Sequence, residues 1–442
     1  MSFPRYPAYK KQELQCVTYS IPVSWDIKPL KAVTSFNDEV LPESTDPDLE
    51  IEYVDIGSVS LADGIEKTEV MKFADTPSRA RRIVRDGDVI VSTVRTYLKA
   101  IAPIRKPPKN LIASTGFAVI RPTPSIDSHF LSFSLQSSGF IDAVISRSSG
   151  VSYPAINSSE MARISIPVPS DEEQIAIASF LDRETAKIDA LIAEQQRLIE
   201  LLQEKRQAVI SHAVTKGLNP DAPLKDSGVE WLGQIPAHWN VGKLGYYTVT
   251  TTGSTPDRNN PSYWNGEIPW VKTGEVMYQD IYETEEKISD LALQQTSCSL
   301  LKPGTLLMAL YGQGVTRGRV AMLAVEAACN QACAAIMTDS RINPRFLELF
   351  LTKAYEHIRS LGNETTQQNL NLDFVRKLEI VVPPTEEQNK IVDYLPKKLS
   401  QFDSLMKDVE TEISLLQERR SALISAAVTG QIDVRNLVEA AA

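Results

Sequence analysis

The chain has 442 residues and a formal net charge of −10 at pH 7. It has no apolar run of the roughly 18 residues that a membrane helix needs, and its first residues, MSFPRYPAYKKQ, lack the apolar core of a signal peptide. Four cysteines at irregular positions do not form a disulfide framework, and Cys329 and Cys333 have no second pair to complete a zinc site. These features predict a cytoplasmic protein without a bound metal.

Charge is unevenly distributed in the first block of the chain. Residues 36–75 contain twelve acidic and two basic residues, whereas residues 76–125 contain ten basic and two acidic residues. A domain whose acidic and basic residues are separated in this way can bind a polyanion through its basic segment, even though the net charge of the chain is negative. Solvated surface charge with no partner is the alternative, and composition alone does not indicate DNA.

The first block, residues 1–163, predicts an α+β domain. Its segments 54–66, 87–104 and 115–122 alternate or run apolar between glycine, proline and aspartate, as strands do. A helix is expected at 129–145, and a polar loop follows it at 146–157.

Residues 164–219 predict one long helix. Asp171 lies three residues before Gln174, which is the spacing of a capping box. Apolar residues then return at seven-residue intervals: Leu181, Ile188, Leu202 and Val209. About 40 residues at 1.5 Å each make a rod of roughly 60 Å. The narrow seam indicates a partner helix, although a helix that merely faces a core is the alternative.

The second block, residues 220–377, has the same pattern of strands, helix and polar loop and is also expected to be an α+β domain. Strands are expected within 266–276, 304–325 and 330–339, a helix at 345–361, and a polar loop at 362–371. The segment LYGQGVTRG is interpreted as the tip of a hairpin, because another strand follows it.

Residues 378–433 repeat residues 164–219 without a gap, so equivalent positions differ by 214. The repeated seam continues in the second copy: Leu395, Phe402, Val409, Leu416 and Leu423. Thr385 and Gln388 repeat the capping signal, and Pro396 is expected to kink or restart this helix. The same offset relates Trp25 to Trp239. The chain is therefore an internal duplication, and its two helices are expected to pair as an antiparallel coiled coil.

Recurring stretches, in order, carry a family resemblance: SGVEWLGQIPAHW, GSTPDRNNPSYWNGEIPWVKTGEV, LKPGTLLMALYGQGVTRG, NQACAAI, TTQQNLNL and IVVPPTEEQNKIVDYL, with IPVPSDEEQIAIASFLD at the duplicated position. They resemble the specificity (S) subunit of type I restriction-modification systems over essentially the whole chain. The resemblance implies two target recognition domains in pseudo-two-fold tandem repeat, at 1–163 and 220–377. Two conserved spacer helices at 164–219 and 378–433 would separate them, with a C-terminal tail at 434–442.

The resemblance also implies a function. Each recognition domain would read half of a bipartite sequence in double-stranded DNA, and the chain itself would have no catalytic activity. Two modification subunits would bring S-adenosylmethionine and methylate adenine, and restriction subunits would bring ATP and Mg²⁺ for translocation and cleavage, so this chain would bind no cofactor. The alternative function is a structural adaptor whose coiled coil spaces two protein-binding domains.

Two motifs suggest enzymes but are incomplete. Asn260-Pro261-Ser262-Tyr263 is similar to the Asn-Pro-Pro-Tyr site of adenine methyltransferases, with serine in place of the second proline. Gly312 and Gly314 suggest a nucleotide loop, but no helix is expected to follow them.

Candidate DNA contacts are the basic, aromatic and amide residues of turns and polar loops. In the first block these are Arg79, Arg81, Arg82, Arg95, Tyr97 and Lys99. In the second block they are Thr255, Arg258, Tyr263, Lys272, Gln313, Thr316, Arg317, Arg319 and Gln368.

Overall fold

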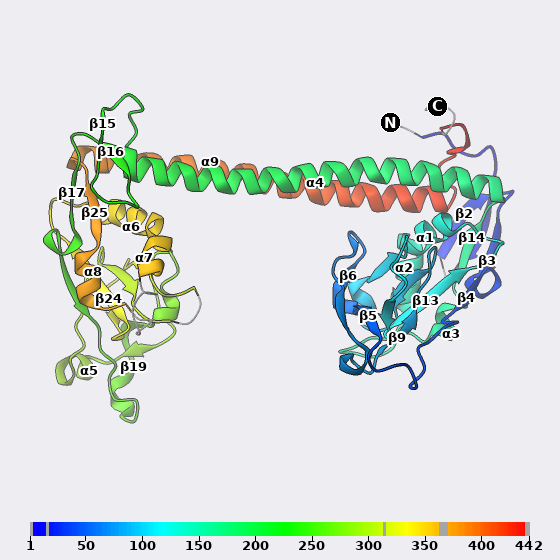
Figure 1. The fold of residues 1–442 in the computed structure, drawn as a ribbon, viewed down its shortest axis with the longest axis horizontal. Coiled ribbons are helices and arrows are strands. Elements are labelled where there is room, and N and C mark those ends of the chain that lie inside the picture. Colours follow the sequence, from blue (N-terminus) through cyan, green and yellow to red (C-terminus); the bar gives the residue numbers. More distant parts are fainter. Residues whose placement is uncertain (1–2, 15–16, 313–314, 362–369, 438–442) are drawn as a thin grey trace. The chain divides into compact units, whose positions relative to one another are not determined.

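The structure is a computed structural model that describes residues 3–14, 17–312, 315–361 and 370–437. The chain divides into two compact units (Figure 1): unit 1 comprises Met1–Arg197 and Val409–Ala442, and unit 2 comprises Leu198–Asp408. Each unit therefore combines a strand-rich part with one stretch of each long helix. Within the described ranges, no helix is long and apolar enough to cross a bilayer.

Two four-stranded sheets form the strand-rich part of unit 1. The first is antiparallel, in the order β11 (Ile101–Pro103), β10 (Val89–Ser92), β13 (Phe117–Pro122) and β4 (Thr34–Phe36). The second is in the order β8 (Glu69–Lys72), β5 (Glu50–Val54), β12 (Leu111–Ser114) and β9 (Ala80–Ile83), and its β5–β12 pair is parallel. Unit 1 also has two hairpins: β1 (Tyr9–Leu14) with β2 (Val17–Pro22), and β6 (Val59–Ser60) with β7 (Gly64–Ile65).

The helix expected at 129–145 is two helices in the structure. These are α1 (Ser128–Gln136) and α2 (Ser138–Arg147), and a short α3 (Ser158–Met161) follows. The break occurs because Ser137 has an extended backbone and its hydroxyl accepts the Phe140 N–H, which starts a new helix. Phe130, Leu131 and Phe140 bury this layer against the first sheet.

Unit 2 likewise combines a four-stranded antiparallel sheet with smaller sheets and short helices. Its main sheet is antiparallel, in the order β18 (Thr248–Thr252), β24 (Cys333–Thr338), β21 (Leu306–Ala309) and β22 (Val320–Met322). Smaller sheets join β20 (Lys287–Ile288), β19 (Trp264–Val271) and β23 (Ala328–Cys329), and β15 (Leu224–Asp226) with β16 (Gln234–Pro236). Its short helices are α5 (Asp290–Gln295), α6 (Pro344–Lys353), α7 (Tyr355–Leu361) and α8 (Leu372–Lys377).

A strand pair of equal register leads into each long helix. In unit 1, β3 (Asp26–Pro29) pairs with β14 (Ser165–Val168), and in unit 2, β17 (Asn240–Lys243) pairs with β25 (Glu379–Val382). Every paired position in the second ladder is its partner in the first plus 214. Trp25 and Trp239, at equivalent positions beside these strands, are fully buried. The duplication in sequence is therefore a duplicated structural frame.

The long helices α4 (Asp171–Lys216) and α9 (Thr385–Val428) begin where the sequence predicts, but the predicted capping box is wrong. At the start of α4 it is the Ser170 hydroxyl that accepts the Glu173 N–H, at 3.4 Å. Gln174 is not a capping partner. It is 1% exposed and bonds two groups outside the helix.

Gln174 and its equivalent Gln388 fasten each strand-rich part to its long helix. The Gln174 amide accepts the N–H of Asp127, the N-cap of α1, at 2.8 Å, and donates to the Pro169 carbonyl at 3.1 Å. Gln388 accepts the N–H of Asn343, the N-cap of α6, at 2.7 Å, and likewise donates to a proline carbonyl. Each unit therefore has an equivalent glutamine with the same pair of hydrogen bonds, which we call the glutamine clamp.

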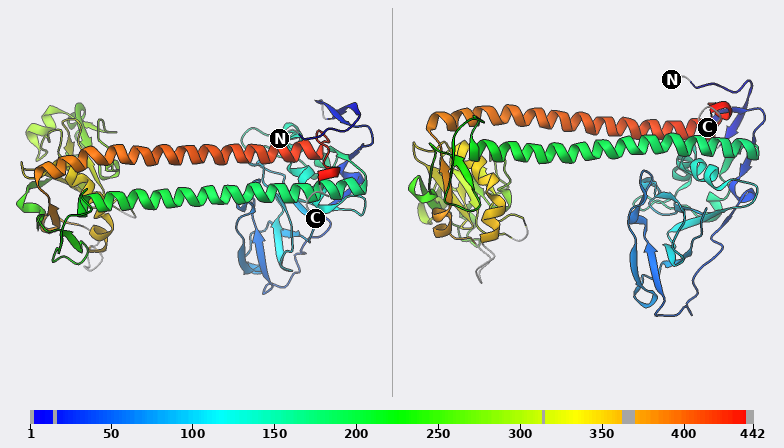
Figure 2. Two further views of the ribbon diagram at one scale, coloured as in Figure 1. Left: turned by 90° about the horizontal axis from the view of Figure 1, so that it is seen from above. Right: turned by 45° about the horizontal axis from the view of Figure 1, so that its top comes forward.

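The two long helices lie side by side and antiparallel, as predicted (Figures 1 and 2). Arg420 of α9 pairs with Asp189 of α4 at 2.8 Å in unit 1, and Arg206 of α4 pairs with Asp403 of α9 at 3.2 Å in unit 2. The offset of 214 converts one ion pair into the other. The predicted seam is buried or half-buried along both helices, which confirms the heptad interpretation.

Pro396 does not restart the second helix. The helix α9 runs continuously through Pro396, which is exposed. Because proline has no backbone N–H, one hydrogen bond of this turn is absent, and the neighbouring turns keep the helix continuous.

Candidate nucleic-acid interface

In unit 1, the candidates Arg95, Tyr97 and Lys99 lie on one exposed turn that follows β10. A single turn of 3-10 helix, Thr96–Leu98, is flanked by two residues in the left-handed region, Arg95 at φ 51° and Lys99 at φ 53°. Thr96 is buried, and its hydroxyl lies 2.8 Å from that of Ser148. The turn therefore has a fixed centre, and its long side chains face solvent.

The polar loop that follows α2 lies against this turn. The Ile156 N–H donates to the Thr93 carbonyl at 2.9 Å, and Ser149 and Ala155 exchange two backbone hydrogen bonds of 2.9 Å. At the tip of the loop, the Tyr153 ring centroid lies 4.9 Å from the Arg95 guanidinium. The sequence marked this loop as polar and exposed but did not single out Tyr153.

The arginines of 79–82 lie in different settings. Arg79 is exposed, and Arg81 and Arg82 are half-buried on β9. Arg81 lies over the Phe73 ring at 4.6 Å, and burial lowers the pKa of Arg82. The Arg79 carbonyl accepts the Thr115 N–H at 2.7 Å.

The turn Thr115–Gly116 connects the two basic segments. The Gly116 carbonyl accepts the Thr93 N–H at 2.8 Å, and Thr115 bonds to Arg79 as described above. The exposed Arg79 and the Arg95 turn therefore flank one β-turn and can share one polyanion.

In unit 2, β21 and β22 form the predicted hairpin, with Met308 opposite Val320. Thr316, Arg317 and Arg319 follow its tip, whereas Gln313 and Gln368 lie outside the described residues. Arg317 is buried, and its guanidinium donates to the Arg359 carbonyl at 3.2 Å. We therefore assign Arg317 a role in holding the hairpin.

A pair of tyrosines that the sequence did not single out lies beside Arg319. The Tyr278 ring lies 5.8 Å from its guanidinium, and Tyr355 lies edge-on to Tyr278 at 6.0 Å. Burial raises the pKa of the Tyr278 hydroxyl well above its usual value, so this tyrosine stays neutral. Neutral rings beside cations are suitable for stacking on bases.

The other candidates of unit 2 are engaged with neighbouring side chains. Arg258 makes two hydrogen bonds with Glu286, at 2.8 and 2.9 Å, and lies over the Trp264 ring at 3.9 Å. Lys272 pairs with Glu285 at 2.6 Å. These partners raise the pKa values of Arg258 and Lys272. Because their charge is compensated, they are weaker candidates for phosphate contacts than the Arg95 turn.

Thr255 and Tyr263 also have protein partners. The Thr255 hydroxyl donates to the Gln331 side chain, and the Tyr263 hydroxyl donates to Gln295 at 3.2 Å. Both residues are half-buried. The structure thus groups the unit 2 candidates into two sets, one at the hairpin and one around β19.

The methyltransferase-like motif has a structural role. The Asn260 side chain accepts the Ser262 N–H at 3.1 Å and the Ser262 hydroxyl at 2.7 Å, so it caps the short helix Pro261–Tyr263.

The buried cysteines are poor metal ligands. Burial raises the pKa of the Cys329 thiol to about 12, which disfavours the thiolate that binds metals. Among the described residues, no cluster of His, Cys, Asp and Glu could hold a metal ion.

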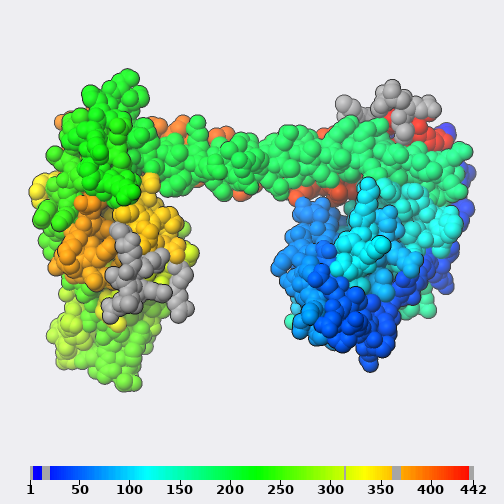
Figure 3. All heavy atoms as spheres, in the orientation of Figure 1, coloured from blue at the N-terminus to red at the C-terminus, as the bar shows by residue number. Residues whose placement is uncertain are grey.

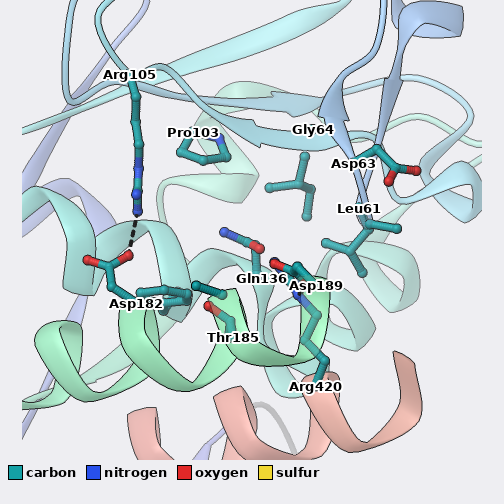
Figure 4. A pocket seen from close by; sticks show the side chains of 14 residues that line it. Leu61, Asp63, Gly64, Pro103, Arg105, Gln136, Asp182, Thr185, Asp189 and Arg420 are labelled. Atoms are coloured by element: carbon teal, nitrogen blue, oxygen red, sulfur yellow. Dashed lines mark hydrogen bonds and ion pairs between the residues drawn. The ribbon is translucent and has the colours of Figure 1, made fainter. Parts of the chain in front are cut away.

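A cavity of about 320 Å³ in unit 1 lies between the β6–β7 hairpin, α1 and the long helices (Figure 4). Asp182 of α4 accepts from Arg105 at 3.0 Å, and His129 Nδ1 lies 2.7 Å from its other oxygen. Asp189 and Arg420, already paired, line the same cavity. Two ion pairs join elements across this cavity, so we interpret it as part of the attachment between the strand-rich part and α4.

Comparisons with known proteins agree with this arrangement. A family model described as the type I restriction modification DNA specificity domain matches residues 78–201 and 236–415. The chain is 21% identical to the putative type I restriction enzyme MjaX specificity subunit of Methanocaldococcus jannaschii, over 98% of this chain and 99% of the relative. It is 24% identical to the HindI specificity subunit of Haemophilus influenzae, over 82% and 90%.

Two solved structures have the same fold. A chain from a structure on complex assembly and conformational transition of the type I R-M system matches with a TM-score of 0.67 and 23% identity, over 94% of this chain and 100% of that chain. The HsdS subunit from Thermoanaerobacter tengcongensis matches with a TM-score of 0.53 and 22% identity, over 94% and 99%.

Proposed function

Because the chain belongs to the type I restriction-modification DNA specificity family, whose members recognise the target sequence and are non-catalytic, we propose that it reads a bipartite target in double-stranded DNA. The strand-rich part of each unit reads one half-site. The recognition domains are residues 1–163 and 220–377, and the helical segments 164–219 and 378–433 join them.

The observation that carries this proposal is a duplicated frame around different loops. Gln174 and Gln388 make the same two hydrogen bonds, and the strands before α4 and α9 pair in the same register. The loops that these frames hold differ, with the exposed Arg95 turn in unit 1 and the β21–β22 hairpin, which contains the half-buried Arg319, in unit 2. The same frame with different loops favours two recognition domains of the same fold that bind two different half-site sequences.

The chain works inside a type I restriction-modification complex, and we propose its partners from the duplication. Leu191 of α4 and Leu415 of α9, both in unit 1, are exposed, and so are their equivalents in unit 2, Leu405 and Leu201. Figure 3 draws all heavy atoms of both units. Equivalent apolar surfaces bind equivalent partners, which supports two modification subunits.

The chemistry belongs to the partners in this proposal. The modification subunits carry S-adenosylmethionine and methylate adenine, and the restriction subunits carry ATP and Mg²⁺ and cleave the DNA. The complex acts in the cytoplasm, where its DNA substrate is found. An adaptor that only joins proteins would not need the paired basic and aromatic loops described above.

Exchange of one recognition domain tests the proposal. Residues 1–163 are replaced by the corresponding block of a relative, the chimera is co-expressed with the modification subunit, and methylated adenines are mapped across the genome. We expect one half-site to change while the other half-site and the gap are retained. A change in both half-sites, or sequence-independent methylation by the native chain, would contradict the proposal.

A further inference from the structure

We propose that the Arg95 turn and the loop at 148–155 form one base-reading element, in which Arg95 recognises a guanine of the unit 1 half-site and Tyr153 positions its guanidinium. This inference rests on the proposed function and assigns a specific base contact within it. It also adds Tyr153, which no sequence motif marks, as a positioning residue.

The backbone of this element is held in a conformation that a free chain would avoid. Arg95 and Lys99 both occupy the left-handed region, which a Cβ atom disfavours. The Leu98 N–H bonds to the Arg95 carbonyl at 2.9 Å, and the buried Thr96 hydroxyl is fixed by Ser148. Such strain persists where the surroundings determine the backbone, and it is concentrated at functional sites. The side chains are therefore presented in fixed directions.

Tyr153 restricts the direction of the Arg95 side chain. The ends of the Tyr153 loop are joined by the two Ser149–Ala155 hydrogen bonds, and Ile156 ties it to β10 through Thr93. The guanidinium lies over the ring at 4.9 Å. Stacking covers one face of the guanidinium and leaves its edge N–H groups free to donate in the guanidinium plane. That edge matches the O6 and N7 acceptors of guanine in the major groove.

The surroundings of Arg95 favour a base over a phosphate. Val151 at the loop tip is fully exposed, Tyr153 is 65% exposed and Tyr97 is 52% exposed. Apolar and aromatic groups add nothing to a phosphate contact, but they pack on thymine methyl groups and base faces. Arg79 and Lys99, both exposed, are in place for the backbone on either side.

The test uses the full chain in complex with its modification subunit and a library of duplexes with a randomised first half-site. The variants are Arg95→Lys, Arg95→Asn, Tyr153→Ala and Tyr153→Phe. Lysine keeps the charge without the bidentate edge, and asparagine tolerates the left-handed backbone. The control is Arg163→Ala, because Arg163 is an exposed arginine whose partner is Glu160 on the same turn.

We expect Arg95→Lys to lose about 10- to 100-fold of discrimination at one G·C position, with an unchanged salt dependence. Tyr153→Ala should lose part of the same discrimination, and Tyr153→Phe should retain it. If Arg95→Asn instead weakens all sequences equally and lowers the salt slope by about one, Arg95 contacts a phosphate and the inference is wrong. Unaltered discrimination in both Arg95 variants would also overturn it. Retention of the second half-site shows that the proposed function stands in either case.

Discussion

At the junction with its long helix, Gln174 bonds two backbone groups and Gln388 bonds three, the additional one being the Arg341 carbonyl. The side chain of Gln174 is 1% exposed and that of Gln388 is fully buried, so water cannot replace either hydrogen bond. A buried N–H or carbonyl left without a partner costs about 1–3 kcal/mol. These two amides therefore contribute more to the attachment of the strand-rich parts than surface ion pairs do.

Replacement of Gln174 by methionine should destabilise unit 1 by about 2–4 kcal/mol, because the Asp127 N–H and the Pro169 carbonyl lose their partner while the volume is retained. Denaturant unfolding followed by Trp fluorescence measures the loss. The matched control is Gln196→Met on the exposed surface of α4, which should change stability by less than about 0.5 kcal/mol. Equal effects of both substitutions would show that the clamp does not hold the unit.

Single residues show where prediction from the sequence ends. Asp171 and Gln174 have the residue types and spacing of a capping box, and the same glutamine is equally suited to a tertiary clamp. Arg258 looks like a free cation until Glu286, 28 positions later in the chain, is placed beside it. Arg317 is buried although its type and turn position indicate exposure. In each case a partner distant in sequence determines the role, and one sequence does not show which partner that is.

Elements with strong periodicity were predicted well. The starts of both long helices, their pairing and the β21–β22 hairpin follow from the sequence because each depends on local pattern or on the repeat. The break at Ser137 was missed because apolar residues continue on both sides of it. The expected restart at Pro396 was wrong, because the buried Leu395 and Phe402 pack the helix on both sides of the proline.

Pro396 provides a test at the scale of one helix. Because α9 is continuous and Pro396 is exposed, alanine would restore a hydrogen bond to the Val392 carbonyl without opening a cavity. We expect Pro396→Ala to raise the free energy of local opening by about 1–3 kcal/mol, seen as slower amide hydrogen exchange in this part of α9. Lys397→Ala, at an exposed neighbouring position, should have little effect. Faster exchange in Pro396→Ala would mean that the helix requires the proline.

At the scale of the whole molecule, the repeat predicts that unit 1 and unit 2 are equivalent frames. The ion pairs Asp189–Arg420 and Arg206–Asp403 support this, because one becomes the other when 214 is added to one number and subtracted from the other. The antiparallel register also shows how the helices must be altered together. Extra residues in α4 alone would shift one of these ion pairs relative to the other.

If the paired helices set the spacing of the half-sites, lengthening both should lengthen the gap. One heptad is inserted in α4 after Gln196 and one in α9 after Glu412, which keeps the seam and both ion pairs in register. Seven residues add about 10 Å, or roughly three base pairs of duplex. Methylation mapping should then show two unchanged half-sites separated by about three more base pairs. Helices that act only as a flexible tether would instead accept several gap lengths before and after the insertion, so relaxed spacing in either protein would exclude a rigid spacer.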